Sequence, residues 1–231
     1  MSLPGWLNIK LLAGLLLLLK IPLAGAEIQL QQTRLVYPAG KSSVILVIKN
    51  SDTTHAVAIE SWVESGRRDI TITPATLIIK PGRHGTLNIH IPDNEHGDNQ
   101  ESLYWLNVKG IPLGKSHLPE QLAISVINRI KIFYRPQMLF AGAGEVYNKL
   151  NVSACGKQLT IKNPTPYYIN FYSFKADDEE VETVRLLGPY ETQSVSLPAG
   201  QHPIARWQAI LDSGFHSPLI SKKITSDCSY Y

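Results

Sequence analysis

The stretch QLAISVINRIKIFYR, residues 121–135, carries the strongest structural signal in the chain. Five aliphatic residues in it share one parity, and therefore one face of a β-strand: Leu122, Ile124, Val126, Ile130 and Ile132. Only Asn128 interrupts that face. The opposite face is lighter and more polar, except at Ile127 and Phe133. The pattern predicts a long strand, and for an arbitrary sandwich the simplest interpretation is a central strand buried on both sides.

Shorter segments with the same alternation lie on both sides of this stretch, separated by turn residues, and no stretch keeps a helical period for long. The expected strands cover residues 43–49, 57–63, 86–91, 102–108, 158–162, 167–174, 192–197 and 207–211. This spacing predicts an all-β fold made of immunoglobulin-like sandwiches, each of about 100 residues.

The first 26 residues have the pattern of a cleaved export signal. Lys10 precedes an apolar run over 11–19, and small residues at 24–26 offer a cleavage site. Lys20 and Pro22 interrupt the run well short of the roughly 20 residues that span a bilayer. We therefore expect an exported protein that is not embedded in the membrane.

The exported part divides into two expected domains. Gly142 and Gly144 loosen the chain after the long strand, and a second set of strands begins near Leu150. We place an N-terminal immunoglobulin-like domain at 27–143 and a C-terminal one at 144–231. The formal charge is +3, and two of the cations lie in the signal, so the nearly neutral exported chain gives no indication of nucleic-acid binding.

Cys155 and Cys228 are the two cysteines of the chain. An oxidising compartment permits them to form a disulfide, which in the chain-entropy model contributes about 4 kcal/mol by closing a long loop. Two free buried thiols are the alternative. Two cysteines without a histidine at ligand spacing make a poor zinc site.

Three motifs together resemble the periplasmic pilus-chaperone (PapD-like) family, and the likeness covers nearly all of the exported chain. They are TRLVY at 33–37, IKIFYRP at 130–136 and NPTPYY at 163–168. The resemblance implies two immunoglobulin-like domains arranged in an L. It also implies a periplasmic chaperone that binds, folds and caps pilus or fimbrial subunits and delivers them to an outer-membrane usher.

In that family the last long strand of the first domain completes the unfinished sandwich of a subunit, a form of strand addition. The resemblance assigns this donor role to Leu122, Ile124 and Val126. It assigns the binding of the subunit's C-terminal carboxylate to Arg34 and Lys131. Lys131 has the opposite parity to the donor residues, so we expect a bulge or a strong twist near Asn128 to reconcile them. The exposed strand could also let the chaperone self-associate.

The resemblance further implies a network of acidic and basic residues between the domains. Glu101 and Asp212 match its acidic members, and Asn88 stands where the alignment places its arginine. This substitution would weaken or reroute the interdomain bridge.

Two other classes of function compete with this interpretation. A secreted two-domain carbohydrate-binding adhesin would use Trp62, Trp105 and Trp207 as stacking surfaces, although aromatic residues in sandwiches usually belong to the core. An enzyme is not expected, because no nucleophile–base signature is present and the histidines are scattered. His84, His90 and His96 are too widely spaced along strands for a shared metal, so we expect neither metal nor cofactor.

Overall fold

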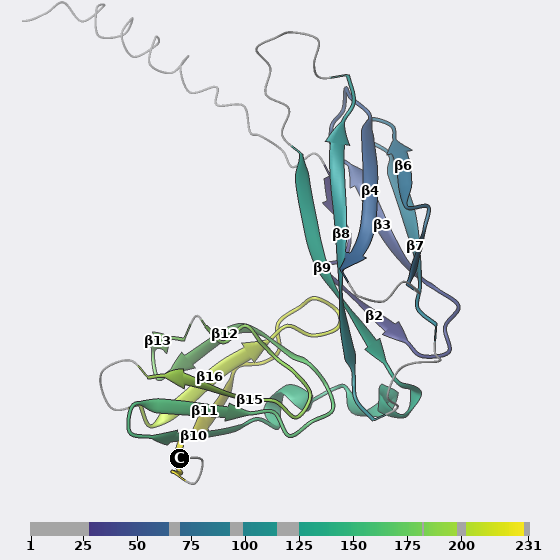
Figure 1. The fold of residues 1–231 in the computed structure, drawn as a ribbon. Coiled ribbons are helices and arrows are strands. Elements are labelled where there is room, and N and C mark those ends of the chain that lie inside the picture. The colour runs from purple at the N-terminus through teal and green to yellow at the C-terminus, as the bar shows by residue number, and fades with distance from the viewer. Residues whose placement is uncertain are drawn as a thin grey trace, which may run out of the picture.

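The computed structural model describes residues 28–64, 70–92, 99–114, 125–181, 183–197 and 202–228. These residues form two β-sandwich domains that meet in an L (Figure 1), so the all-β prediction is confirmed. Each domain has its own core of buried side chains. None of the helices in these ranges is long and apolar enough to cross a bilayer.

Domain 1 consists of two packed sheets. One has the order β1-β3-β7-β5, with β1 (Ile28–Leu30), β3 (Val44–Asn50), β7 (His84–His90) and β5 (Thr71–Thr73). The other has the order β2-β9-β8-β4-β6, with β2 (Arg34–Pro38), β9 (Val126–Arg135), β8 (Ser102–Pro112), β4 (Val57–Glu64) and β6 (Thr76–Ile79). The second sheet contains Arg34 and Lys131.

The two faces of β9 have different environments. Ile130, Ile132 and Tyr134 are buried in the core of domain 1, whereas Lys131 lies on the opposite face. β9 pairs with β8 in one unbroken antiparallel register from Val126 to Tyr134. The expected bulge near Asn128 is therefore wrong, because residues of even and odd number alternate without a shift along this part of the strand.

Domain 2 also has two layers. One sheet has the order β15-β11-β10-β18, with β15 (Thr192–Ser196), β11 (Gln158–Lys162), β10 (Asn151–Cys155) and β18 (Thr225–Ser226). The other has the order β13-β12-β16-β17, with β13 (Glu179–Glu180), β12 (Ile169–Ala176), β16 (Ile204–Ala209) and β17 (Ile220–Lys223). A further short strand, β14 (Leu186–Leu187), also pairs with β12. Trp207 is fully buried and stacks on Phe174 in the core between the layers.

The connection between the domains is packed and not loose. It contains two short 3-10 helices, η1 (Gln137–Gly142) and η2 (Val146–Asn148). The hydroxyl of Tyr167 donates to the carbonyl of Leu139 at 2.6 Å. A Cβ at Gly142 would lie within 2.4 Å of that hydroxyl, so glycine is required there by close approach and not for flexibility. A division of the chain between residues 143 and 144 stays a prediction.

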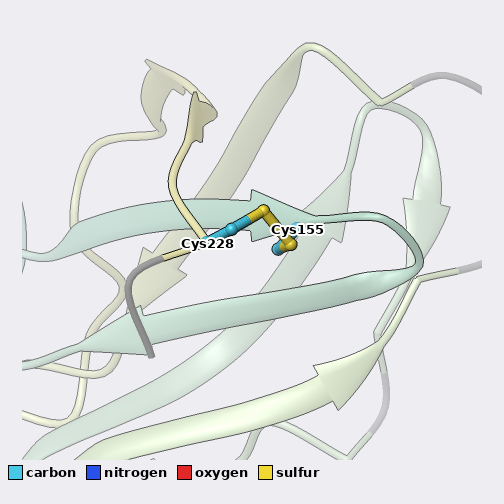
Figure 2. The surroundings of a disulfide bond; sticks show 2 residues. All are labelled: Cys155 and Cys228. Atoms are coloured by element: carbon cyan, nitrogen blue, oxygen red, sulfur yellow. A yellow bond between two sulfur atoms is a disulfide. The ribbon is translucent and has the colours of Figure 1, made fainter. Parts of the chain in front are cut away.

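Cys155 and Cys228 form a disulfide (Figure 2), so the alternative of two free thiols is wrong. The bond joins the end of β10 to the segment after β18, across a sequence separation of 73. β18 pairs with β10 in parallel through Ser153↔Thr225 and Ala154↔Ser226. The disulfide thus holds the end of the chain against the edge of β10.

Replacement of both Cys155 and Cys228 by alanine should lower the free energy of unfolding of domain 2 by about 2 to 5 kcal/mol, because the unfolded chain regains the freedom of a long loop. Denaturant titration followed by tryptophan fluorescence of the buried Trp207 measures this change. A reducing agent should destabilise the wild type to the same extent and leave the double variant unchanged. Equal stability of the oxidised wild type and the variant would contradict this expectation.

Candidate functional site

The parallel pairing of β2 with β9 brings Arg34 and Lys131 side by side. The register places Arg34 opposite Lys131, and the pairing continues to Pro38 opposite Arg135. Leu35 and Tyr37 of β2 are buried in the core of domain 1, so Arg34 has the outward parity, as Lys131 does. Two segments nearly a hundred residues apart in sequence therefore present two cations on one face.

The Arg34 side chain lies where the two domains meet. Its Nη1 donates to the carbonyl oxygen of Ile210 in domain 2 at 2.9 Å, and the residue is 8% exposed. Its Nε is buried and has no hydrogen-bond acceptor among the described residues. Burial lowers the pKa of Arg34, and the charge of Asp212 opposes that effect. The guanidinium thus keeps one buried N–H donor that the described residues do not pair.

Lys131 lies in a similar environment. Its Nζ is 5.3 Å from the centroid of the Trp105 ring, at cation–π distance. Burial lowers the pKa of Lys131, and the neighbouring charge of Arg34 lowers it further. In the part of the chain that the structure describes, no carboxylate forms an ion pair with either cation. Two partly desolvated cations without such a partner favour the binding of an anion, and a carboxylate suits both.

β9 has one edge that no described strand covers. On one side β8 pairs with it from Val126 to Tyr134, but on the other side β2 begins only opposite Lys131. The backbone of Val126–Ile130 on the β2 side, here called the free edge, consequently has no strand partner among the described residues. Unpaired backbone groups of this kind are a template for another strand.

The free edge carries one of the three predicted donor residues. Val126 is 49% exposed and its neighbour Ile127 is 51% exposed. Leu122 and Ile124 lie outside the described residues. The interpretation of the whole stretch as a strand buried on both faces is wrong at Val126 and Ile127, which are exposed where β9 is the edge strand of its sheet.

A second cluster of charges joins the domains, and its arginine is Arg135. Its Nε donates to Glu101 at 2.6 Å, and its Nη1 and Nη2 donate to the two carboxylate oxygens of Asp212 at 2.6 and 3.0 Å. The expectation that the network lacks its arginine is wrong. Asn88 lies in β7, and its amide donates to the carbonyl of Thr73 within the other sheet of domain 1.

Burial and ion pairing have opposite effects on the pKa values of this cluster. Burial alone would lower the pKa of Arg135, but the hydrogen bonds and charges of Asp212 and Glu101 outweigh it and raise the pKa. Burial raises the pKa of Glu101, and Arg135 opposes that rise. The side chain of Glu101 is 2% exposed, so its charge depends on Arg135 for compensation.

The motif at 163–168 forms the turn by which domain 2 contacts Glu101. The backbone N–H of Tyr168 donates to the Glu101 carboxylate at 2.8 Å, and the N–H of Glu101 donates to the carbonyl of Pro166 at 2.9 Å. Asn163 is fully buried and holds the turn by donating from its amide to the carbonyls of Tyr167 and Gly188. The motif therefore orients the two domains.

Three features of the site escaped prediction. Trp105 pairs with Lys131 in register, and its ring also lies 4.1 Å from the guanidinium of Arg129. The carbonyl of Ile210 and the side chain of Arg135 complete the junction. Of these, Arg135 was detectable, since it shares the outward parity of Lys131 and stands at the end of the first domain.

The three tryptophans of the adhesin alternative do not gather on one surface. Trp207 is fully buried in domain 2, while Trp62 is 40% exposed in domain 1. Trp105 lies between two cations. In the described ranges, no three acidic, histidine or cysteine residues gather as a metal site, and His96 lies outside those ranges.

Comparison with known domain families matches most of the chain. Residues 27–139 match the family described as "Pili and flagellar-assembly chaperone, PapD N-terminal domain". Residues 145–221 match "Pili assembly chaperone PapD, C-terminal domain".

Individual proteins and structures give the same picture. The chaperone protein FimC of Escherichia coli O6:H1 is 35% identical over 218 residues, 90% of each chain. The structure of the periplasmic chaperone SfaE has a TM-score of 0.72 at 26% identity and covers 85% of this chain and all of that one. The Salmonella enterica SafB chaperone, solved with the SafA pilin, has a TM-score of 0.77 over 85% of this chain and 96% of that chain. At 21% identity, the likeness to SafB shows the fold.

The Arg135→Met variant should be about 3 to 5 kcal/mol less stable than the wild type at neutral pH, because it leaves the Glu101 carboxylate buried without its cation. The pKa of Glu101 in the folded variant then rises further above its ordinary value of 4.5. A carboxyl group whose pKa is raised by folding stabilises the folded state below its ordinary pKa and loses that contribution as pH rises. The deficit of the variant should therefore grow as pH increases from about 4.5.

Denaturant unfolding at several pH values checks this expectation. Adding Glu101→Gln to Arg135→Met removes the titrating group, so the pH-dependent part of the deficit should disappear. A deficit that stays constant with pH in the single variant would show that Glu101 does not depend on Arg135.

Proposed function

This chain belongs to the PapD family of pilus-assembly chaperones, and on that premise we propose that it captures a pilus subunit by adding the free edge of β9 to the subunit's unfinished sandwich. Its role is that of a fimbrial assembly chaperone. The observation that carries the proposed mode of capture is the register of Arg34 with Lys131. It places the two cations where the free edge ends.

The position of the two cations fixes the direction of the bound strand. β2 begins at Arg34, so a subunit strand on the free edge lies end to end with β2. A C-terminal carboxylate held by Arg34 and Lys131 must be the end of that strand nearest to β2. The subunit strand consequently runs toward Lys131, parallel to β9.

The side chains that enter the subunit are those of even number. Val126 has the parity of Ile130 and Ile132, so it continues the core-facing row of β9 along the free edge. Leu122 and Ile124 have the same parity and are proposed to continue this row. Each aliphatic side chain buried in the subunit contributes roughly 1.5 to 3 kcal/mol before ordering costs.

The opposite parity of the anchor is compatible with this arrangement. Lys131 and Arg34 approach from the outward face, whereas the donor side chains lie on the core face. The terminal carboxylate belongs to the backbone end of the bound strand, which is accessible from either face. The donor side chains and the two anchoring cations can therefore bind the same subunit strand, although β9 has no bulge.

The setting follows from the family and from the start of the chain. We propose that the leader at 1–26 directs export to the periplasm, and that the subunit passes from this chaperone to an outer-membrane usher. Before capture, the free edge is equally open to a second copy of the chain, which would give a self-associated resting form.

The Lys131→Gln variant should lose the subunit, because it removes one of the two cations that hold the carboxylate. We expect a loss of about 2 to 5 kcal/mol, or at least about 30-fold in affinity. Co-purification from a periplasmic extract, with the partner identified by mass, measures the loss. Lys109→Gln is the matched control, since Lys109 lies on β8 of the same sheet and pairs with Glu60. Equal recovery of the subunit by the Lys131→Gln and Lys109→Gln variants would contradict the role of Lys131 as a carboxylate anchor.

Val126→Asp should impair capture by at least about tenfold, because it places a carboxylate in the apolar groove of the subunit. Ile127→Asp should have a much smaller effect, since Ile127 is equally exposed but has the opposite parity. Both residues lie at the surface, so neither substitution should lower the melting temperature. Affinity measurements on the purified variants compare the two, and a larger effect of Ile127→Asp would reverse the proposed donor face.

A further inference from the structure

Domain 2 exposes two large apolar side chains on one hollow, and a third next in the chain to His216, whose ring contacts one of them. Tyr172 of β12 is 50% exposed, and Leu219, just before β17, is 58% exposed; both line one shallow hollow of about 640 Å³. The ring of Tyr172 stacks on His216 at 3.6 Å between centroids, and the adjacent Phe215 is 76% exposed. Apolar side chains that gather in this way on a soluble protein mark an interaction site more often than scattered ones do.

Charged residues of both signs surround this apolar group. The hollow is also lined by Lys175 and Arg206 and by Asp178 and Glu180. Arg206 donates to Asp178 at 3.3 Å, and Asp178 is fully exposed. An apolar centre with a charged border is the usual composition of a protein–protein interface. We call these residues, together with Phe215, the inner face of domain 2.

The inner face is continuous with the carboxylate anchor. The connection from β16 to β17 carries Phe215, and in the same connection Ile210 accepts the hydrogen bond from Arg34. A Cβ at Gly214 would lie 3.5 Å from the hydroxyl of Thr33, next to Arg34. Figure 1 shows the β12–β16 layer as the side of domain 2 that is turned toward domain 1.

The connection is held in place and is not a loose loop. Within it, the N–H of Leu211 donates to the carbonyl of Phe215 at 2.8 Å, and the N–H of Gly214 donates to the carbonyl of Leu211 at 2.9 Å. Asp212 is held by Arg135 of domain 1. Phe215 is therefore an exposed aromatic on an ordered turn, and its contact with a partner would incur little ordering cost.

We propose that the inner face of domain 2 is a second contact surface for the same subunit, and that it takes an apolar patch with a charged border on the subunit's body. This inference rests on the proposed function. A strand added to the free edge of β9 brings the rest of the subunit into the inner corner of the L, above the β12–β16 layer (Figure 1). Adjacent strands are only about 4.8 Å apart and packed sheets about 10 Å, so the body of a small sandwich reaches this layer.

Photo-crosslinking in the periplasm of the native host tests which partner occupies this surface. A photoreactive amino acid replaces Phe215 in one variant, Ile127 on the free edge in a second and Ile45 in a third. Ile45 is the matched control, because it is an exposed apolar residue (52%) on β3 in the other sheet of domain 1. Partners are identified by mass spectrometry.

The proposal expects the same subunit to be crosslinked from Phe215 and from Ile127, and no subunit from Ile45. Crosslinking of the subunit from Ile127 but not from Phe215 would overturn the proposal that the inner face contacts the subunit. The proposed function would be unaffected by that result. A crosslink from Phe215 to a second copy of the chain, or to an outer-membrane protein, would also overturn it. If neither position captures a subunit, the proposed function fails together with this inference.

A binding measurement gives an independent test with the subunit identified from Ile127. The double variant Tyr172→Ser, Phe215→Ser should dissociate from that subunit about tenfold faster than the wild type, because both side chains lose apolar contact area. Its melting temperature should be unchanged, since both residues are exposed. Ile45→Ser should behave as the wild type. A dissociation rate of the double variant within twofold of the wild type would contradict the contact.

Discussion

The pairing of β2 with β9 determines the positions of both the free edge and the pair of cations. Because β2 begins opposite Lys131, one strand interaction places Arg34 beside Lys131 and also ends the coverage of β9. The free edge and the cationic pair therefore share a boundary. Shortening or extending β2 would separate the two features, and a strand bound to the edge would no longer end at the cations.

The interdomain charge cluster supports this arrangement at the other end of β9. Arg135, at the end of the same strand, is bonded to Glu101 and Asp212, and the turn at 163–168 adds backbone hydrogen bonds to Glu101. A buried cation shared by two carboxylates resists separation of the domains, since separation would leave a charge without its partner. The orientation of domain 2, and with it the position of the inner face, is fixed by this cluster.

Local patterns predicted the fold well and predicted the site in part. Alternation along the chain identified the longer strands, because side chains of one parity share a face; β11 occupies the predicted residues 158–162, and the other predicted strands differ at their ends. Short strands such as β1, β5 and β6 were not predicted. The motifs suggested Arg34 and Lys131, but their juxtaposition depends on a pairing between distant segments. The partners of Arg135 lie 34 and 77 residues away, beyond any local period, so an inferred alignment placed the arginine wrongly at Asn88. The expected bulge assumed that donor side chains and anchor must share a face, which the geometry does not require.

The start of β2 also acts as a stop. A chain that lay on the free edge and continued past Lys131 would run into the backbone of Arg34, which already occupies the next position along β9. An internal segment of a polypeptide would have to turn out of the sheet at this point, whereas a chain terminus can end there beside the two cations. Such a chaperone would favour a substrate whose last residue has already emerged from the secretion channel. The start of one short strand would in this way favour completed chains over incomplete ones.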